Sequence, residues 1–250
     1  MEAKLMHAVQ YDSYGGGTSE RRGAASLPCK FPFIPALDVA GEIVKVGKGV
    51  KRFKAGDKVV AVLSFLIGGG LAEYAVASQS LTASRPPEVL AAEGAGLPSC
   101  GLTAHQAVTQ AAGIKLDKTG QLKNVLITGA TGGIGHYAVQ LAKLGNTHVT
   151  ATCGARNIEI VKSLGADEVL DYKTPDGAAL KSPSDTHLFQ EEAGTIFVNP
   201  KGDNLDYLVK LMKEGKLKTV IDSKHPLSKA EDAWAKGIDG PCTGKIIVEQ

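Results

Sequence analysis

One glycine-rich stretch, residues 128–135, has the composition and spacing of a phosphate-binding loop. It reads TGATGGIG, and the pattern Gly-x-Gly-x-x-Gly places Ala130, Gly132 and Gly135 at its three small-residue positions. Small residues permit a tight turn and let backbone N–H groups approach a diphosphate at the positive end of a helix. The stretch predicts a dinucleotide-binding loop, and a glycine-rich turn without a ligand is the alternative. The loop residues are Ala130, Thr131, Gly132, Gly133, Ile134 and Gly135.

The next turn indicates which dinucleotide fits. Sites for NAD place an acidic residue about 20 positions further on, where it binds the ribose 2′-hydroxyl. Here Cys153, Gly154, Ala155, Arg156 and Asn157 occupy the turn, and none of them carries a carboxylate. A guanidinium suits the extra 2′-phosphate of NADP, which a carboxylate would repel. These residues favour NADPH, and a solvent-exposed arginine without a ligand is the alternative.

The loop needs a strand before it and a helix after it, and the sequence predicts both. The apolar run 124–128 is typical of a strand buried in a parallel sheet. The apolar residues of 134–142 recur at helical spacing. We expect further strands at 148–152 and 169–172, with a helix at 158–164 between them. This order is half of a Rossmann-type, doubly wound parallel sheet, so the predicted fold class is α/β.

The residues before 87 have a different character. Glycine turns separate short alternating segments there, which suggests a small β-barrel or partly open β-domain. Residues 88–112 are rich in Ala and Leu and predict helix, split in two by Pro98 and Gly101. Other strands are expected at 3–11, 38–46, 71–76, 195–198, 219–222 and 245–248, and within 53–62 a turn at 55–57 is expected to lead into a further strand. Other helices are expected at 205–214 and 228–236.

The overall composition excludes several classes of protein. Lys and Arg total 28 against 26 Asp and Glu, which leaves no basic excess for binding nucleic acid. No apolar run reaches the ~20 residues of a membrane-spanning helix. The four cysteines are scattered, and no histidine has zinc-ligand spacing to a Cys or Glu. His136 and His148 fit a helix surface and a strand better than they fit catalytic bases.

Several segments, in their order along the chain, resemble the zinc-independent medium-chain dehydrogenases/reductases of the quinone oxidoreductase type. The resemblance covers most of 31–172 and resumes at 205. It implies a GroES-like substrate domain over 1–87, a Rossmann domain over 88–222 and a return to the substrate domain over 223–250. The segments that carry it are DVAGE at 38–42, GDKV at 56–59, GGLAEY at 69–74, GLTA at 101–104 and the loop at 130–135.

The resemblance implies reduction of quinones or α,β-unsaturated carbonyls by hydride from NADPH, bound in the cleft between the two domains. The cofactor carries this chemistry, so no protein nucleophile is needed, and the sequence identifies no catalytic residue. The zinc-dependent branch has Gly-His-Glu where this chain has Ala36, Leu37 and Asp38, so no catalytic zinc is expected. The resemblance implies that Gly132, Gly133 and Ile134 face the diphosphate and Thr103 the nicotinamide amide, with Arg156 and Tyr172 near the 2′-phosphate and Cys153 and Asn157 in the same turn.

The chain departs from this family in two places, where internal pieces are missing. Only 14–30 stand where relatives carry several strands, and 184–194 replace two strands whose loops cover the nicotinamide. Losing sheet strands leaves their neighbours without hydrogen-bond partners. We therefore expect the adenosine half of the site to survive better than the nicotinamide half. The alternative function is a catalytically impaired variant that binds only a nucleotide or a partner protein.

The resemblance also implies a location and partners. We expect a small-molecule quinone or enone substrate, no nucleic acid, no integral membrane span, and peripheral association with the chloroplast envelope. The cytoplasm is the alternative location. A homodimer formed through a Rossmann edge strand is also expected, with 195–198 as the remnant of that strand.

Overall fold

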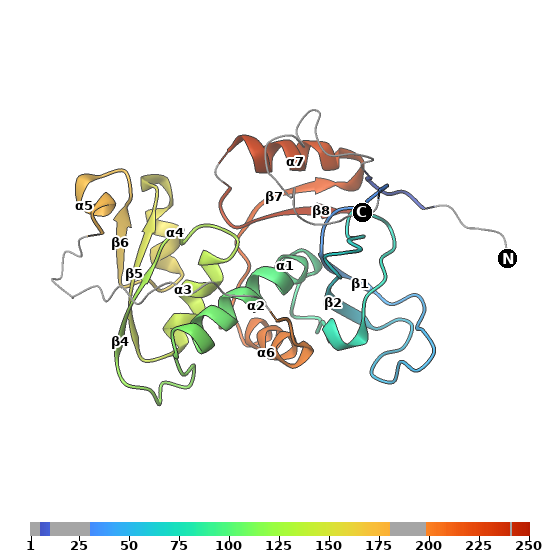
Figure 1. The fold of residues 1–250 in the computed structure, drawn as a ribbon, viewed down its shortest axis with the longest axis horizontal. Coiled ribbons are helices and arrows are strands. Elements are labelled where there is room, and N and C mark those ends of the chain that lie inside the picture. Colours follow the sequence, from blue (N-terminus) through green and yellow to red (C-terminus); the bar gives the residue numbers. More distant parts are fainter. Residues whose placement is uncertain (1–5, 11–30, 181–198, 241) are drawn as a thin grey trace.

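The computed structural model describes residues 6–10, 31–180, 199–240 and 242–250. Figure 1 shows three β-sheets around a central group of helices, with a parallel sheet at one end and an antiparallel sheet at the other. This arrangement confirms the predicted α/β class, with an N-terminal β-domain before the parallel sheet. None of the helices in the described ranges has both the length and the apolar character needed to cross a membrane.

The N-terminal sheet holds three antiparallel strands, β1 Asp38–Glu42, β2 Lys58–Val62 and β3 Thr82–Ser84. β2 is the middle strand, and its Val60 is fully buried. β1 is shorter than predicted, because it ends at Glu42 and not at position 46. β2 begins directly after the predicted turn at 55–57, where Gly56 has φ +89°. β3 was not predicted, since three residues are too few to show an alternating pattern.

The strand expected at 71–76 is not formed. Within 71–76 only Ala72 forms a β-bridge, and its partner is Ala8. The strand expected at 3–11 is likewise not formed in its described part, where Ala8 alone forms a bridge. The preceding glycines at φ +62° and φ +110°, Gly68 and Gly69, turn the chain away from an extended path. The β-domain therefore has fewer regular strands than the sequence suggested.

The parallel sheet has the order β4 Lys123–Ile127, β5 Thr147–Cys153 and β6 Glu168–Asp171. Helices α3 Gly135–Leu144 and α4 Ile158–Ser163 connect the strands. The strands and α4 agree with their predicted bounds to within one residue. The apolar runs are strong here, and glycine turns separate them clearly.

β4 is the exception to the predicted burial. The sequence predicted a buried strand, but residues 124–127 are only half-buried. β4 pairs with β5 along one edge, and within the described ranges no strand pairs with its other edge. The predicted strand 195–198, like the stretches 14–30 and 184–194, lies outside the described residues.

Helices α1 Ala91–Gly96 and α2 Pro98–Gln106 cross the centre of the molecule, and α6 Gly202–Lys213 packs against α2 (Figure 1). The helices α1 and α2 separate where predicted, but α2 continues through Gly101 unbroken. A Cβ atom at Gly101 would lie 2.7 Å from Leu97 Cδ1. The glycine therefore serves close packing and not helix termination. The core between α2, α3 and α6 includes Leu102, Tyr137, Leu141, Leu205 and Leu208.

The C-terminal part forms a separate parallel pair, β7 Ile221–Pro226 and β8 Lys245–Glu249. Helix α7 Ala230–Asp239 covers it (Figure 1). Gln250 Nε2 donates to Ala72 O at 3.1 Å, which ties this pair to the N-terminal domain. One short helix, α5 Pro175–Ala178, follows β6.

Candidate functional site

The glycine-rich loop turns sharply between β4 and α3. Gly129 has φ +62°, a left-handed conformation that glycine adopts at little cost. Ala130 is fully buried, and its N–H donates to Thr152 O of β5 at 3.0 Å. The Gly132 N–H donates to Gly129 O at 2.9 Å, which closes the turn. Backbone bonds within the loop and to β5 thus fix its shape.

Gly135, the first residue of α3, is in close contact with this loop. A Cβ atom at Gly135 would lie 2.2 Å from Gly129 O and 2.8 Å from Ala130 Cα. Both are backbone atoms, which cannot move aside as the end of a flexible side chain can. The third small position is therefore required by the contact between the helix and its own loop, as the dinucleotide-binding pattern predicts.

The loop leaves backbone donors free at the start of α3. Within the described ranges, the N–H groups of Gly133 and Ile134 have no hydrogen-bond acceptor. They precede a helix of 10 residues, and a helix N-terminus carries about half a positive charge. Free N–H groups at such an end are suited to phosphate or another anion. The residues present therefore fit the diphosphate of a dinucleotide.

His136 supports the loop from the interior of the protein. The prediction that it lies on a helix surface is wrong, because its side chain is fully buried in the first turn of α3. Burial lowers the pKa of His136 to about 4, so the ring is neutral near pH 7. Its Nδ1 lies 2.9 Å from Gly132 O and donates to it. Helical spacing of apolar residues could not reveal this role, because histidine was not counted among them.

Two residues expected near a 2′-phosphate lie at the ends of β5 and β6. Arg156 is exposed in a short 3-10 turn, Ala155–Asn157. Tyr172 follows β6 and is half exposed, and a Cβ atom at Gly154 would lie 3.4 Å from Tyr172 Oη. The loop after β4 lies at the same edge of the sheet, because parallel strands share their carboxyl ends. Open α/β sheets bind their ligands at this edge.

Cys153 and Asn157 belong to the same turn but face inward. The Cys153 side chain is 1% exposed, so only its backbone can lie against a ligand. The Asn157 side chain is also buried, and its Oδ1 accepts from Thr243 Oγ1 at 3.3 Å. These two residues therefore support the turn from its buried side.

Thr103 lies half-buried on α2, and its Oγ1 donates to Ser99 O at 2.7 Å. Cys100, almost one helical turn earlier, reaches the loop: a Cβ atom at Gly133 would lie 3.1 Å from Cys100 Sγ. The structure therefore brings α2 and the glycine loop together, although they are about thirty positions apart in the sequence.

The sequence did not predict that the C-terminal segment touches the loop. Gly244 N–H donates to Thr131 O at 2.7 Å, and Lys245 N–H donates to Val220 O at 2.9 Å. Gly244 has φ +84°, and a Cβ atom there would lie 2.0 Å from Val220 O. The only signal in the sequence was a glycine just before the last strand, and glycine is common in turns that contact no binding site.

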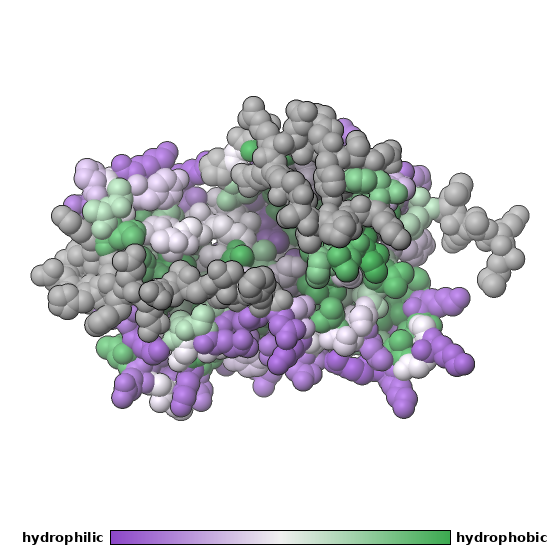
Figure 2. All heavy atoms as spheres, viewed as in Figure 1, coloured by the Kyte–Doolittle hydropathy of each residue, from purple (hydrophilic) through white to green (hydrophobic). Residues whose placement is uncertain are grey.

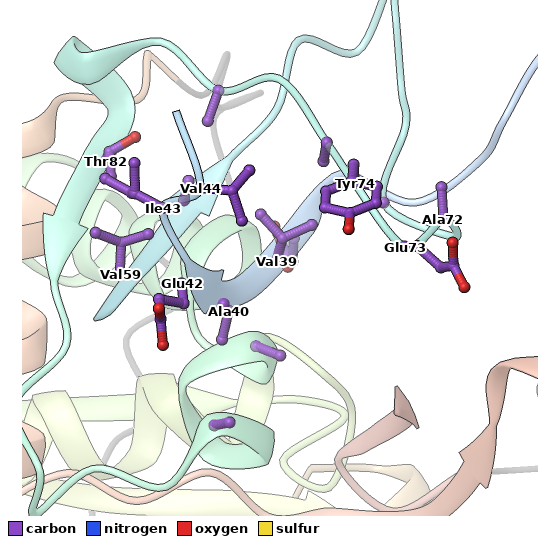
Figure 3. A pocket seen from close by; sticks show the side chains of 18 of the residues that line it. Val39, Ala40, Glu42, Ile43, Val44, Val59, Ala72, Glu73, Tyr74 and Thr82 are labelled. Atoms are coloured by element: carbon purple, nitrogen blue, oxygen red, sulfur yellow. The ribbon is translucent and has the colours of Figure 1, made fainter. Parts of the chain in front are cut away.

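A cavity of about 720 Å³ lies elsewhere, over β1 and β2 (Figure 3). Val39, Val44 and Val59 line it together with Tyr74, and none of the predicted site residues does. Glu42 also lines it, and a carboxylate would repel phosphate. This cavity belongs to the N-terminal sheet and is not the dinucleotide site.

The surface around these strands carries exposed apolar side chains. Figure 2 shows apolar residues gathered in the part of the view where β1 and β2 lie. Val44, Ile67 and Val76 are 67%, 72% and 93% exposed. Large contiguous apolar patches are rare on the surface of monomeric proteins and are found at interaction sites.

Two family models match the chain. The model described as alcohol dehydrogenase GroES-like domain matches residues 11–87, and the one described as zinc-binding dehydrogenase matches 178–248. In the part of the chain that the structure describes, no group of three or more His, Cys, Asp or Glu side chains could hold a metal ion.

Curated relatives extend over the whole chain. The chloroplast envelope quinone oxidoreductase homolog of Arabidopsis thaliana is 53% identical, and the alignment covers 100% of each chain. That alignment spans 328 positions, whereas this chain has 250 residues, so the relative carries internal stretches that this chain lacks. The chloroplastic NADPH-dependent alkenal/one oxidoreductase of Arabidopsis thaliana is 34% identical over 87% of this chain and 64% of its own.

The fold has a similar counterpart among solved structures. The quinone oxidoreductase from Coxiella burnetii superposes with a TM-score of 0.80, covering 98% of this chain and 99% of the other at 24% identity. The matched N-terminal domain, the parallel sheet with its glycine loop and the full-length relatives agree with one another. The chain belongs to the medium-chain dehydrogenase/reductase family, among the relatives of plant quinone oxidoreductases.

Proposed function

We propose that this chain is an oxidoreductase that uses NADPH to reduce quinones or α,β-unsaturated carbonyls without a catalytic zinc. The observation that carries the proposal is the loop at the start of α3, where Gly133 and Ile134 leave their N–H groups free in the described ranges. The relatives named for quinone and alkenal/one reduction support the class of substrate.

The preference for NADPH rests on the turn after β5. Arg156 supplies a positive charge there, and residues 153–157 contain no carboxylate. A Cβ atom at Gly154 in the same turn would lie 3.4 Å from Tyr172 Oη, and this proximity supports the proposal that Tyr172 faces the ribose phosphate. A guanidinium can form two parallel hydrogen bonds with a phosphate, which gives it an advantage over the 2′-hydroxyl of NADH.

The bound cofactor supplies the hydride, and the residues of this chain bind and orient it. Gly133 and Ile134 bind the diphosphate through their backbone N–H groups, and Gly132 faces it with its N–H bonded to Gly129 O. Buried His136 keeps that loop in place. Thr103 on α2 is proposed to face the nicotinamide amide. Because hydride transfer needs no protein nucleophile, we assign no catalytic residue among those described.

A second candidate function is supported by the edge of β4. Within the described ranges this edge has no paired strand, although in a complete Rossmann sheet the equivalent strand is central. A chain that lacks strands near the nicotinamide would still bind the adenosine half of the cofactor. It would then act as a nucleotide-binding or partner-binding variant without turnover.

We also propose a location and partners for this chain. The relatives with chloroplast names support a chloroplast location, and we extend this to peripheral association with the envelope; the cytoplasm is the alternative. We also propose a homodimer, with no nucleic-acid partner. The domain bounds 1–87, 88–222 and 223–250 are proposed on the same basis.

Titration of the folded chain with NADPH and NADH, followed by calorimetry, tests the proposal. We expect micromolar binding of NADPH and binding of NADH at least about tenfold weaker, because a charged hydrogen bond contributes roughly 1.5–3 kcal/mol. Oxidation of NADPH in the presence of a simple quinone and of a simple enone would support the reductase. Binding without oxidation of NADPH would support the second candidate. Absence of binding by a folded chain would exclude the reductase and leave only a partner-binding variant.

A further inference from the structure

Three segments that are far apart in the sequence meet beside the glycine loop. Ser99 and Cys100 lie in the first turn of α2, Asp38 begins β1, and Lys245 begins β8. One Asp38 oxygen accepts hydrogen bonds from both the backbone N–H and the hydroxyl of Ser99. This carboxylate is therefore fixed at the junction between the N-terminal sheet and α2.

Lys245 connects the carboxylate to the thiol. Its Nζ lies 3.7 Å from Asp38 Oδ2 and donates to Cys100 Sγ at 3.2 Å. Burial alone would lower the pKa of Lys245, but the neighbouring Cys100 and Asp38 outweigh burial and raise it above its usual value. The ammonium therefore keeps its proton at neutral pH.

The sulfur lies against the part of the loop where the free N–H groups are. A Cβ atom at Gly133 would lie 3.1 Å from Cys100 Sγ and 3.5 Å from Lys245 Cδ. The cluster is not sealed, because the side chains of Lys245 and Asp38 are 20% and 13% exposed and Cys100 is half-buried. A small reagent from solvent can therefore reach the thiol.

The other described cysteines have different surroundings. Cys153 is buried at the end of β5, and burial raises its pKa. Burial also raises the pKa of Cys242, which follows α7. Lys236 and Arg156 lie near Cys242 and partly offset this rise. In the described ranges, however, a lysine donates a hydrogen bond to the sulfur of Cys100 and to neither of these two, and reactive cysteines are found beside such groups.

We propose that Cys100 is a site of covalent modification by α,β-unsaturated carbonyl compounds. The thiolate forms an S–C bond to the β-carbon of the alkene, and the electron pair of the C=C bond moves onto the carbonyl as an enolate. The α-carbon then takes a proton from water. The product is a thioether that contains every atom of the electrophile, with no net oxidation or reduction.

This modification does not require turnover, and only its consequence rests on the proposed function. A thioether on Cys100 Sγ would occupy space beside Gly133, where the cofactor diphosphate would lie. Modification and cofactor binding should therefore exclude each other. A compound of the class proposed as substrate would then also block the protein when NADPH is scarce.

Alkylation by N-ethylmaleimide, itself an α,β-unsaturated dicarbonyl, tests the proposal with the full chain. Cys29 lies outside the described residues and is replaced by serine so that it does not consume reagent. Peptide mass spectrometry then follows Cys100, Cys153 and Cys242 over time in the same sample. We expect Cys100 to react fastest and Cys153 slowest. Labelling of Cys100 no faster than Cys242 would overturn the proposal.

The variant Lys245→Met separates the effect of the ammonium from simple exposure. We expect labelling of Cys100 to slow by about tenfold, because the variant lacks the ammonium that donates to Cys100 Sγ. Lys224→Met is the matched control, since Lys224 pairs with Glu249 on the surface of the same two-stranded sheet, and it should leave the rate unchanged. Cys153 reports on the fold: it stays protected only while the chain is folded. If Lys245→Met exposes Cys153, the variant Lys245→Arg is used in its place. Lys245→Arg retains the positive charge and should keep the fast labelling of Cys100.

Preincubation with NADPH completes the experiment. We expect NADPH at about ten times its Kd or more to slow labelling of Cys100 by about tenfold or more, because it would occupy the site in most molecules. Fast labelling that NADPH does not affect, in a chain that calorimetry shows to bind NADPH, would overturn the mutual exclusion. A chain that does not bind NADPH but is still labelled fastest at Cys100 would contradict the proposed function and leave the modification site intact.

Discussion

The region around the glycine loop and the region around β1–β3 differ in how they are held together. Near the loop, hydrogen bonds join segments that are far apart in the sequence. The Tyr137 hydroxyl donates to Thr219 Oγ1 at 2.7 Å, and the Thr219 hydroxyl donates to Glu93 O at 2.7 Å. Around β1–β3, Ile67 and Val76 expose most of their side chains, and a cavity opens over the sheet.

The difference shows which parts of a fold tolerate the loss of internal segments. A loop between a strand and a helix is built from neighbouring backbone, so it keeps its shape when distant strands are missing. A β-barrel depends on closure, since each strand protects the edge and the inner face of the next. We therefore expect the cofactor half of this protein to resist the shortening better than the substrate half.

The same substitution in both regions tests most directly whether they differ in packing. Leu208 is fully buried between α6 and α2, whereas Leu66 near the N-terminal sheet is 52% exposed. We expect Leu208→Ala to lower the free energy of unfolding by about 2–5 kcal/mol, and Leu66→Ala by less than about 0.5 kcal/mol. Urea denaturation measures both. Equal losses would mean that the two regions are equally well packed.

The pH dependence of unfolding tests the role of buried His136 in the loop region. Burial holds the pKa of His136 at about 4 instead of 6.5, so below pH 6.5 the unfolded chain binds a proton that the folded chain does not. The stability from neutral His136 is present above pH 6.5 and is lost as pH falls toward 4, by roughly 2–3 kcal/mol at pH 4.5. His136→Gln should lose less stability than the parent protein between pH 7.5 and pH 4.5, as urea denaturation at the two pH values would show. Equal losses in the two proteins would assign the acid sensitivity to other groups.

The close contact at Gly135 joins stability to binding. Gly135→Ala places a Cβ atom 2.2 Å from Gly129 O, and overpacking of this kind costs about 1–3 kcal/mol. We expect that loss in urea denaturation and at least a tenfold weaker affinity for NADPH in calorimetry. The control is Gly47→Ala, because a Cβ atom at Gly47 meets no atom within 4 Å. An unchanged NADPH affinity in a folded Gly135→Ala protein would contradict the proposed loop.

The preference for NADPH over NADH tests the role of Arg156 in the turn after β5. Arg156→Gln should weaken NADPH binding by about 10–100-fold, the range of one charged hydrogen bond, and leave NADH binding unchanged. Lys162→Gln on α4 removes another exposed charge, which pairs with Glu159, and it should change neither affinity. A parallel loss for both nucleotides in Arg156→Gln would show that Arg156 supports the turn and does not select the phosphate.

The smallest effect is expected in the N-terminal region, at Ala36. Its φ of +68° is a left-handed conformation that costs an alanine about 1–2 kcal/mol, part of which a glycine recovers. Ala36→Gly should therefore raise the free energy of unfolding by about 0.5 kcal/mol. Differential scanning calorimetry of the two proteins would detect the small rise in Tm. A fall would mean that the methyl group of Ala36 has a packing role that outweighs the strain.

The sequence was most informative where short-range patterns decide the structure. The bounds of β4, β5 and β6 and the loop at 129–135 were predictable, because apolar runs and glycines fix them locally. The burial of His136 and the contact of Gly244 with Thr131 were not, since both depend on segments that approach through the tertiary fold. The half-buried state of β4 also differed from expectation, because burial depends on which strands flank it and not on its own residues.

The hydrogen bond from Gly244 to Thr131 has a consequence for how the protein is made. The glycine loop leaves the ribosome more than a hundred residues before Gly244 does, and domains fold as their segments emerge. During that interval the Thr131 carbonyl lacks its partner, and Lys245 is not yet beside Cys100. The cofactor loop is therefore synthesised early but completed late, and a nascent chain exposes the Cys100 thiol before its ammonium neighbour arrives.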